Sequence, residues 1–426
     1  MTENALEILR ERGFIDWTSD DAGVEKLFNS GKRVTAYVGF DPTADSLHVG
    51  HLIPLMGLAW LQKLGHRPIL LAGGGTGMIG DPSMKSSERN LLSMDVIAHN
   101  VECVKKQLAH FVSFDCGPNS AILANNYEWL SSMNFLEFLR DVGKYFTINK
   151  MIAKEHVRSR IEDPTKSLSF TEFAYTLLQS YDFYHLYTAE GCRLQLGGND
   201  QQGNITSGID FIRKHEEGAE VYGATNPLLL TSAGHKFGKT EGGAVWLDAK
   251  KTSPYQFYQF WVNSEDATLD KTLRYFTFLP VEEINAVMER HRRAPEKREA
   301  QRLLAYEITA LVHGAHVADN VKHASEILFG GAYTPDDLTD DMLHTLAAET
   351  PCGKVSSLPM ALADVLVEAG ACRSKGEAKR LIAGGGVSVN GIRADEKTVL
   401  EEKDVLCGYY ALLRIGRKKY HMVGRK

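Results

Sequence analysis

The stretch YVGFDPTADSLHVGHLIP, residues Tyr37–Pro54, decides how the rest of the chain is interpreted. The residues before it, Arg33–Val38, have the β-branched and aromatic character of a short buried strand. The residues after it, Leu52–Trp60, repeat apolar side chains at helical spacing. A turn with glycine and proline joins the two. A strand, a turn and a helix N-terminus predict an anion site, because unpaired N–H groups and the helix dipole point at the ligand.

Two histidines, His48 and His51, stand three residues apart at this helix start and can face the same side of its first turn. Gly50 lies between them and lets a flat group approach the backbone. An isolated pair of this kind is more often two surface histidines. The context GFDPTADSLHVGH, however, resembles the HIGH signature of class I aminoacyl-tRNA synthetases, with Val49 at the usual isoleucine. The whole segment GFDPTADSLHVGH resembles the bacterial tyrosyl-tRNA synthetase family in particular.

The composition, with 43% hydrophobic and 24% charged residues in 426, is that of a soluble globular protein of two or three domains. The longest apolar run, Leu52–Leu61, is too short to span a bilayer. The N-terminus carries three glutamates and no apolar core, which argues against a secretory signal. The six cysteines form no CxxC pair. We therefore expect a cytoplasmic protein with reduced thiols, no metal site and no membrane association.

The net charge of −6 is unevenly distributed. Residues 351–426 hold 14 Lys or Arg and 8 Asp or Glu, a net of +6, so the first 350 residues carry −12. A basic tail on an acidic body suggests a polyanionic partner for the tail. An ordinary solvated surface explains the same charges equally well.

Strands, glycine turns and helices alternate in the first half, and they alternate again near residues 121–140, 192–213 and 226–231. This alternation predicts an α/β fold, a Rossmann-like doubly wound parallel sheet. The strand Pro68–Leu71 runs into glycines, but neither a P-loop nor a dinucleotide motif is complete there. From Pro254 onward, amphipathic helical patterns replace the strands. We expect helices at Tyr255–Val262, Leu269–Phe278, Val281–His291 and Glu296–Val312.

The tail after the helices has a pattern of its own. Thr334–Gly353 is acidic and loop-like, Ser374 and Glu377 suggest a capping box, and Val387–Gly391 indicates a strand ending in an Asn-Gly hairpin turn. This tail resembles the small αL-type RNA-binding domain of bacterial tyrosyl-tRNA synthetases. We expect a Rossmann-like catalytic domain at 1–226 with a helical insertion at the dimer contact, a linker with a KFGKT loop at 227–252, a helical anticodon-side domain at 253–335, a linker at 336–353 and the αL-type domain at 354–426.

Amino-acid activation needs cations and hydroxyls more than an acid–base pair, because a carboxylate attacks the α-phosphate of ATP and pyrophosphate leaves. The loop after the expected strand Leu228–Thr231 resembles the family's KMSKS loop, which implies closure over the pyrophosphate. The candidate catalytic residues are Thr43, His48 and His51 in the first motif, Lys85 and Arg89 four apart on an expected helix, and Lys236, Lys239 and Thr240 in the KFGKT loop.

The resemblance also implies the substrate contacts. Tyr37 and Asp182 would bind the phenol of tyrosine, Asp81, Tyr175 and Gln179 its ammonium group, and Gln201 its carboxylate; Gly39, Asp41, Gly50, Gly198, Asp200 and Lys239 would bind ATP. A buried donor–acceptor pair rejects an analogue without the hydroxyl by roughly 10⁴–10⁵, and the measured example is this enzyme family. In GGNDQQGN, Asn199 and Gln202 depart from the family's GGSDQWGN, which puts the packing behind the ligand in doubt.

The implied function is that of a tyrosine--tRNA ligase: L-tyrosine is activated by ATP and transferred to the 3' end of tRNA(Tyr). The implied partners are ATP with Mg²⁺, tyrosine, tRNA(Tyr) and a second copy in a homodimer, with no tightly bound cofactor. Three alternatives stay open at this point. They are an adenylylating enzyme of the same superfamily that never meets RNA, a non-catalytic RNA-binding relative, and a ligase for tryptophan, whose indole N–H needs only one acceptor.

Overall fold

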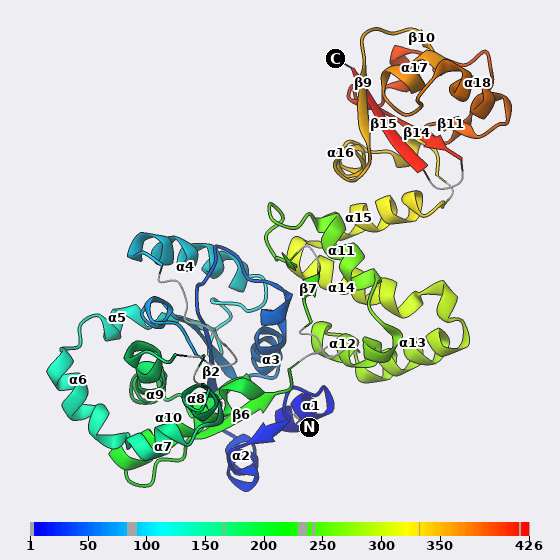
Figure 1. Cartoon of the computed structure of the whole chain (residues 1–426). Coiled ribbons are helices and arrows are strands. Elements are labelled where there is room, and N and C mark those ends of the chain that lie inside the picture. Colours follow the sequence, from blue (N-terminus) through cyan, green and yellow to red (C-terminus); the bar gives the residue numbers. More distant parts are fainter. Residues whose placement is uncertain are drawn as a thin grey trace. The chain divides into compact units, whose positions relative to one another are not determined.

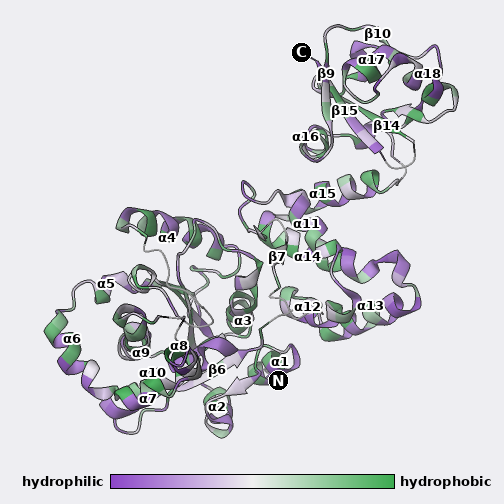
Figure 2. Ribbon diagram, in the orientation of Figure 1, coloured by the Kyte–Doolittle hydropathy of each residue, from purple (hydrophilic) through white to green (hydrophobic). Residues whose placement is uncertain are grey.

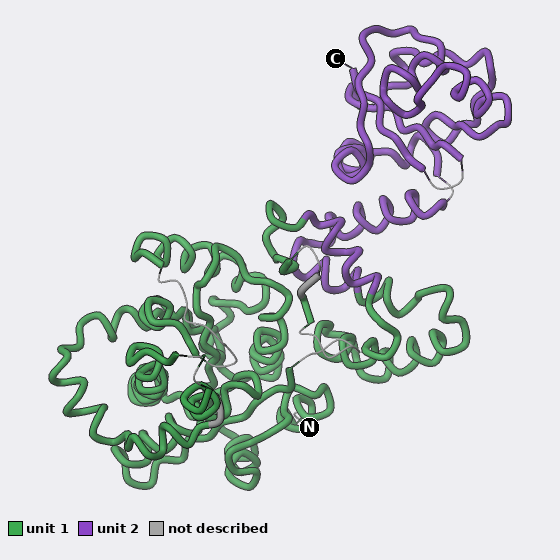
Figure 3. Tube along the Cα trace, viewed as in Figure 1, with its two compact units in different colours: residues 1–252, 264–304 green, residues 253–263, 305–426 purple. Residues whose placement is uncertain are grey.

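The computed structural model describes residues 4–82, 92–163, 165, 167–228, 237–240, 243–331, 333–416 and 419–425. The chain forms two compact units (Figure 3). Unit 1 comprises Met1–Thr252 and Ser264–Leu304, and unit 2 comprises Ser253–Asn263 and Ala305–Lys426. No helix in the described ranges is long and apolar enough to cross a membrane.

Unit 1 is built on a six-stranded sheet of order β1-β6-β5-β2-β3-β4. Neighbours from β6 to β4 pair in parallel, and only β1 runs antiparallel to its neighbour β6. The predicted doubly wound α/β fold is thus confirmed. The strands are β1 Trp17–Thr18, β2 Thr35–Phe40, β3 Arg67–Ala72, β4 Ile122–Asn125, β5 Leu194–Gly198 and β6 Tyr222–Asn226.

The last strand of this sheet, β6 Tyr222–Asn226, was not expected from the sequence. The strand expected at Leu228–Thr231 lies outside the described residues from 229 onward. Val221 and Ala224 are fully buried, and Tyr222 nearly so. Tyr222–Asn226 shows neither the alternation of a half-buried strand nor a continuous apolar run, so its sequence gives little sign of a strand.

Helices cover both faces of the sheet (Figure 1). α3 packs against β2 and β3, and α10 packs against β5, β6 and α9. The helices of unit 1 are α1 Ala5–Glu11, α2 Asp21–Phe28, η1 Val49–His51, α3 Leu52–Lys63, η2 Thr76–Met78, α4 Met94–Leu108, α5 Tyr127–Leu130, α6 Phe135–Asp141, η3 Gly143–Tyr145, α7 Ile148–Ile152, α8 Glu155–Ile161, α9 Phe170–Glu190, η4 Asn199–Gln201, α10 Gln202–His215, η5 Asp266–Thr268, α12 Leu269–Phe276, α13 Val281–Arg293 and η6 Pro295–Lys297, while α14 Glu299–His313 runs from unit 1 into unit 2.

The order of the strands reverses between β2 and β5. β2 pairs with β3 on one side and with β5 on the other, so the connections from these strands leave in opposite directions. In open parallel sheets a crevice forms at the carboxyl ends of the two strands at such a point. β2 leads there into η1 and α3, and β5 leads into η4 and α10. The HVGH and GGNDQQGN segments therefore meet at one edge of the sheet.

The helical region expected at 253–335 is divided between the two units. α12 packs against α3, so residues 264–304 belong to unit 1. The buried Arg12 guanidinium lies 3.7 Å from the centroid of the Trp60 ring and donates to the carbonyls of Arg274 (3.1 Å) and Thr277 (3.2 Å). These carbonyls belong to the end of α12, where the last C=O groups of a helix need outside donors.

Unit 2 carries a second sheet, of order β12-β11-β14-β15-β9. The predicted hairpin is confirmed, since Asn390 (φ 48°) and Gly391 (φ 86°) form the tight turn between β11 and β12. Ser374 caps α18 as expected, although Glu377 accepts from the Arg373 N–H. The elements are α11 Pro254–Val262, α15 Ala315–Leu328, η7 Pro335–Asp337, α16 Asp340–Glu349, β9 Cys352–Val355, β10 Met360–Ala361, α17 Leu362–Glu368, α18 Lys375–Ala383, β11 Val387–Val389, β12 Ile392–Arg393, β13 Val399–Leu400, η8 Glu402–Asp404, β14 Tyr410–Ile415 and β15 Lys419–Arg425.

The expectation of a loop at Thr334–Gly353 is wrong, because helix α16, Asp340–Glu349, occupies half of it. Thr339 caps this helix by accepting from the Met342 N–H. The acidic pair Asp340 and Asp341, which suggested a loop, lies in the first turn, where negative charge is favourable next to the helix N-terminus. The expected domain boundaries themselves stay predictions.

Candidate active site

A cavity of about 420 Å³ opens at the carboxyl ends of β2 and β5. It is also lined by residues that the sequence did not single out, among them Thr76, Gln195 and Phe276. The predicted site residues that line it are Tyr37, Gly39, Asp41, Thr43, His48, Gly50, His51, Asp81, Tyr175, Gln179, Asp182, Gly198, Asp200 and Gln201.

The side chains of five predicted site residues lie outside the part of the chain that the structure describes. Lys85, Arg89 and Lys236 lie outside the described residues, and so do the side chains of Lys239 and Thr240. The backbone of the last two forms β7 (Lys239–Thr240), which pairs with β8 (Gly243–Ala244).

Tyr37 on β2 and Asp182 on α9 are both buried at this cavity. The Tyr37 hydroxyl has no hydrogen-bond partner among the described residues, and neither has the Gln195 Oε1. Burial raises the pKa of Tyr37 well above 10, and the nearby Asp182 charge adds to the shift. The hydroxyl therefore keeps its proton. A buried hydroxyl without a partner costs about 1–3 kcal/mol, so this atom is ready for a ligand.

Asp182 is held by two residues that the sequence analysis missed. The Asn126 amide donates to its Oδ2 (2.9 Å), and the Trp129 indole N–H donates to its Oδ1 (2.8 Å). Burial raises the pKa of Asp182 to about 7, and these two hydrogen bonds act in the opposite direction. Both donors follow the end of β4, and polar residues at the carboxyl end of a predicted strand are the signal that could have identified them.

Opposite this pair, a row of side-chain amides reaches Asp81. The Gln201 Nε2 donates to Asp81 Oδ2 (2.7 Å), the Gln179 Nε2 to Gln201 Oε1 (3.3 Å), and the Asn204 Nδ2 to Gln179 Oε1 (3.0 Å). Each amide is thus oriented by its neighbour, and Asp81 presents a carboxylate to the cavity. Such an arrangement suits an ammonium group.

Asp41 stands between the two ends of the cavity. Its Oδ2 accepts from the Tyr175 hydroxyl (3.0 Å), and its Oδ1 accepts from Thr76 Oγ1 (2.9 Å). Burial and the Asp41 charge raise the pKa of Tyr175 well above 10, so Tyr175 acts as a donor. Tyr175 shares its face of α9 with Gln179 and Asp182, as their spacing predicted.

The two histidines form a stacked pair at the start of η1. Their ring centroids are 4.0 Å apart, His48 Nδ1 accepts from the Gly50 N–H (3.1 Å), and His51 Nδ1 accepts from the His48 N–H (3.2 Å). Burial, assisted by His48, lowers the pKa of His51 to about 3. The His51 ring is therefore neutral near pH 7 and stacks on His48, which lies at the N-terminus of η1. At Gly50 a Cβ would lie 2.8 Å from the His48 ring.

Gly238 of the KFGKT loop lies directly against the HVGH segment. A Cβ at Gly238 would lie 2.3 Å from Val49 Cγ2, and its φ of 87° is a conformation that favours glycine. The Val245 N–H donates back to the Gly238 carbonyl (3.1 Å). Two segments about 190 residues apart in the chain thus form one wall of the cavity.

Comparison with known proteins identifies the family. The sequence profile of the class I tRNA synthetases (W and Y) matches residues 29–330, and that of the tyrosine--tRNA ligase SYY-like C-terminal domain matches residues 342–423. The tyrosine--tRNA ligase of Anaeromyxobacter dehalogenans is 49% identical over 99% of both chains, and tyrosine--tRNA ligase 1 of Bacillus subtilis is 47% identical over 99% of this chain and 100% of its own. The chain belongs to the tyrosine--tRNA ligase family.

A solved structure agrees with this assignment. A C-terminally truncated mitochondrial tyrosyl-tRNA synthetase of Aspergillus nidulans is 34% identical, with a TM-score of 0.68 over 77% of this chain and 94% of its own. Tyrosine--tRNA ligases activate tyrosine and charge tRNA with it, and this chain is an aminoacyl-tRNA synthetase of that class. The tryptophan, small-molecule and non-catalytic alternatives find no support in these relatives.

The two departures from the tyrosine--tRNA ligase motif lie away from the ligand cavity. Asn199 donates from its Nδ2 to Asp16 Oδ2 (2.6 Å), next to β1. Gln202 is exposed at the first position of α10. Neither side chain lines the cavity, whereas the unchanged Gly198, Asp200 and Gln201 do.

Proposed function

We propose that this cavity binds L-tyrosine with its phenol between Tyr37 and Asp182. The unpaired Tyr37 hydroxyl is the observation that carries the proposal, because a buried donor at the end of a cavity requires an acceptor. The tyrosine hydroxyl would accept from Tyr37 and donate to Asp182. Phenylalanine would leave both groups unpaired.

The other end of the same substrate would lie at the amide row. We assign the ammonium group to Asp81, Tyr175 and Gln179, and the carboxylate to Gln201, whose amide is already oriented by Gln179. In this arrangement the carboxylate faces the HVGH segment, where ATP would bind. Substrate orientation of this kind lowers the barrier by fixing the two reacting groups at close distance.

ATP, with Mg²⁺ as its counter-ion, would bind along the carboxyl edge of the sheet. We assign the adenosine to Gly39, Asp41, Gly50, Gly198 and Asp200, all of which line the cavity. A Cβ at Gly198 would lie 2.6 Å from Asp200 Oδ1, which explains the glycine. Thr43 and His48, with Lys85, Arg89, Lys236, Lys239 and Thr240, would stabilise charge on the phosphates, and His51 would hold His48 in place.

Pyrophosphate exchange tests this assignment. With tyrosine and ATP, Tyr37→Phe should lower kcat/KM by about 5- to 13-fold, because a hydrogen bond to the bound phenol contributes about 1–1.5 kcal/mol. The ratio of tyrosine to phenylalanine turnover should fall by a similar factor. Trp60→Phe, a substitution at a buried aromatic outside the cavity, is the control. An unchanged ratio in Tyr37→Phe would contradict the assignment.

We propose further that the chain acts as a homodimer. Large apolar side chains are exposed along the helical insertion, on α6, α7 and the start of α9: Phe135 (63% exposed), Leu136 (72%), Ile148 (56%) and Phe170 (71%). Figure 2 marks hydrophobic residues along α6 and α7. Exposed apolar patches of this kind mark protein interfaces. Leu136→Asp should shift sedimentation equilibrium toward the monomer.

The proposal also covers the C-terminal segment, residues 351–426, and the cellular compartment in which the protein acts. We propose that the basic residues of 351–426 bind tRNA(Tyr) through its phosphates. A cytoplasmic site of action accords with six free cysteines and with bacterial relatives.

A further inference from the structure

A short segment after the KFGKT loop lies across the HVGH turn; we call these residues, Val245–Lys251, the strap. The Val49 N–H donates to the Val245 carbonyl (3.0 Å), and the Leu247 N–H donates to the Leu47 carbonyl (2.9 Å). These two hydrogen bonds flank an antiparallel bridge between His48 and Trp246. In such a bridge the two residues form a non-hydrogen-bonded pair, whose side chains lie on one face at their closest approach.

The side chains confirm this geometry. The Trp246 and His48 rings meet edge to face, with centroids 5.8 Å apart and an interplanar angle of 66°. The His48 ring also stacks on His51, and its Nδ1 accepts from the Gly50 N–H. Among the described residues, two aromatic neighbours and a backbone N–H thus contact the imidazole. Its orientation depends on where the indole lies.

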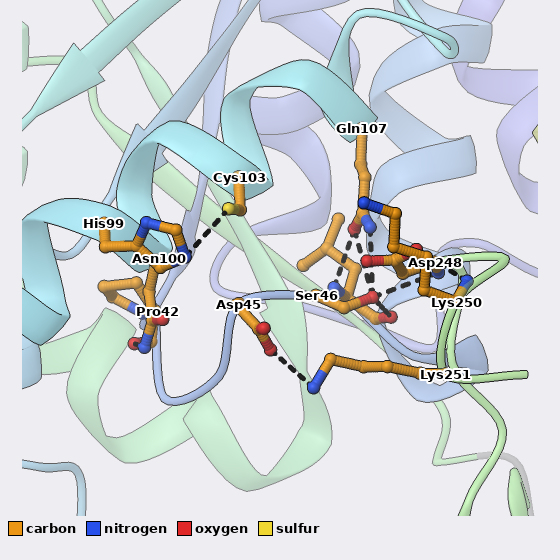
Figure 4. A network of polar contacts seen from close by, with 11 residues as sticks. Pro42, Asp45, Ser46, His99, Asn100, Cys103, Gln107, Asp248, Lys250 and Lys251 are labelled. Atoms are coloured by element: carbon orange, nitrogen blue, oxygen red, sulfur yellow. Dashed lines mark hydrogen bonds and ion pairs between the residues drawn. The ribbon is translucent and has the colours of Figure 1, made fainter.

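The indole is held in turn by an ion pair outside the cavity. The Lys251 ammonium lies 5.3 Å from the centroid of the Trp246 ring and 2.7 Å from Asp45 Oδ1. Figure 4 shows this pair beside a second anchor of the strap. Both charged side chains are about one-third exposed, so the ion pair adds little to the folding stability. Its main effect is to orient the Lys251 ammonium toward the Trp246 ring.

The second anchor comes from α4. The Gln107 Oε1 accepts from the Leu47 N–H (2.7 Å), and its Nε2 donates to Ser46 Oγ (3.0 Å). Ser46 Oγ also accepts from the Asp248 N–H (3.2 Å), so one hydroxyl joins α4, the HVGH turn and the strap (Figure 4). The backbone on both sides of His48 is thereby fixed before any substrate binds.

We propose that Trp246 is a positioning residue for His48 in tyrosine activation, and that Lys251, oriented by Asp45, holds the indole against the imidazole. The inference rests on the role assigned to His48 above. Charge develops on the phosphates only in the transition state, so a displaced imidazole lowers kcat and leaves tyrosine binding unchanged. A misplacement of about 1 Å is enough to cost on the order of 100-fold in rate.

Pyrophosphate exchange by the full chain tests this. Trp246→Leu should lower kcat by about 10- to 100-fold with tyrosine KM changed less than about twofold. Trp246→Phe, which keeps an aromatic edge, should recover most of the rate. Trp60→Phe is a control for the loss of an indole elsewhere in unit 1, and it should leave kcat unchanged. Equal kcat in Trp246→Leu and the wild type would overturn the proposal.

A double-mutant cycle separates positioning from general damage. If Trp246 acts through His48, then Trp246→Leu should cost less than about twofold in a His48→Asn background. Fully multiplicative losses would overturn the proposal.

If Trp246→Leu does not fold, Lys251→Met gives the same information at a partly exposed site. It should lower kcat by about two- to fivefold, and Asp45→Asn should add little to that loss. Lys250→Met, a neighbouring exposed lysine, is the matched control and should leave kcat unchanged. A loss in Lys250→Met equal to that in Lys251→Met would overturn the proposal.

The same assays separate the proposed function of the site from the proposed role of Trp246. A wild-type chain without tyrosine-dependent exchange, or a His48→Asn variant with full activity, would refute the proposed function of the site. An active wild type, an impaired His48→Asn variant and multiplicative losses with Trp246→Leu would refute only the role of Trp246.

Discussion

At the scale of single residues, the proposed recognition of the phenol depends on two acidic groups whose pKa values are both raised by burial. Tyr37 keeps its proton because burial raises its pKa well above 10. Asp182 has a pKa of about 7, raised by burial and opposed by the donors Asn126 and Trp129. The ionised Asp182 is the stronger acceptor for the tyrosine hydroxyl while Tyr37 donates to that hydroxyl.

Tyrosine binding should therefore depend on pH. As the pH rises through about 7, Asp182 ionises and the KM for tyrosine should fall. Stability should move the other way, because the folded state holds a proton that the unfolded chain loses near pH 4: the contribution of Asp182 is complete below about 3.9 and is lost as the pH rises through 7. Pyrophosphate exchange from pH 6 to 8, a range of about one unit on each side of 7, measures the first effect. A pH-independent KM in Asp182→Asn is the expected control.

At the scale of elements, two short contacts hold the site together. Glu172, in the first turn of α9, forms a two-pronged ion pair with Arg160 of α8 (2.9 and 3.2 Å), and each side chain is only 3% exposed. Because α9 carries Tyr175, Gln179 and Asp182, this pair fixes the helix that would bind the substrate in the proposed function.

Glu172→Gln should lower the free energy of unfolding by about 3–5 kcal/mol, because it leaves a buried arginine without its counter-charge. Urea denaturation measures this change. Glu162→Gln is the matched control, since Glu162 pairs with Arg158 at 4.0 Å on the surface and should cost less than about 1 kcal/mol. Equal losses in the two variants would show that the buried pair adds nothing.

The second short contact is the approach of Gly238 to Val49. Gly238→Ala should lower kcat for activation, because the new Cβ would meet Val49 Cγ2 at 2.3 Å and the φ of 87° is strained for alanine. A strain of about 1–3 kcal/mol would lower kcat by about 5- to 150-fold if it destabilises the KFGKT loop in the transition state. Gly218→Ala, also at positive φ but with nothing near it, should keep kcat within about twofold and so controls for strain alone.

At the scale of the whole molecule, the C-terminal region is not a separable tail. Met342, Leu343 and Leu346 of α16 pack in one cluster with Leu412 and Met422 of the terminal sheet. The Tyr420 hydroxyl donates to the Ile327 carbonyl of α15 (2.6 Å). A cut at residue 351 would therefore remove the other half of a hydrophobic core.

Two truncated chains test this organisation. A chain ending at 351 should expose the apolar face of α16 and aggregate more readily than one ending at 333, as light scattering would show. Both should keep tyrosine-dependent pyrophosphate exchange, because every described residue that lines the cavity precedes residue 277. Both should lose tRNA charging, and their affinity for tRNA should depend less on salt. Full charging by either chain would mean that the basic C-terminal segment does not bind tRNA.

Much of this protein follows from contiguous stretches of its sequence. The HVGH turn, the GGNDQQGN turn and the Asn-Gly hairpin appear where expected, because a strand end, a helix cap and a tight turn depend on neighbouring residues. The face of α9 with Tyr175, Gln179 and Asp182 follows from helical spacing alone. The wrong prediction of a loop at α16 also comes from local sequence, because acidic residues are common both in loops and at helix N-termini.

Only the tertiary structure decided which distant segments meet. Asn126 and Trp129 lie more than 50 residues from Asp182, and the strap lies about 200 residues from His48. Such pairings depend on the order of strands in the sheet and on loop closure, neither of which leaves a periodic signal in one chain. Most residues that line the cavity can therefore be named from the sequence, whereas the residues that hold them in place are set by packing between distant elements.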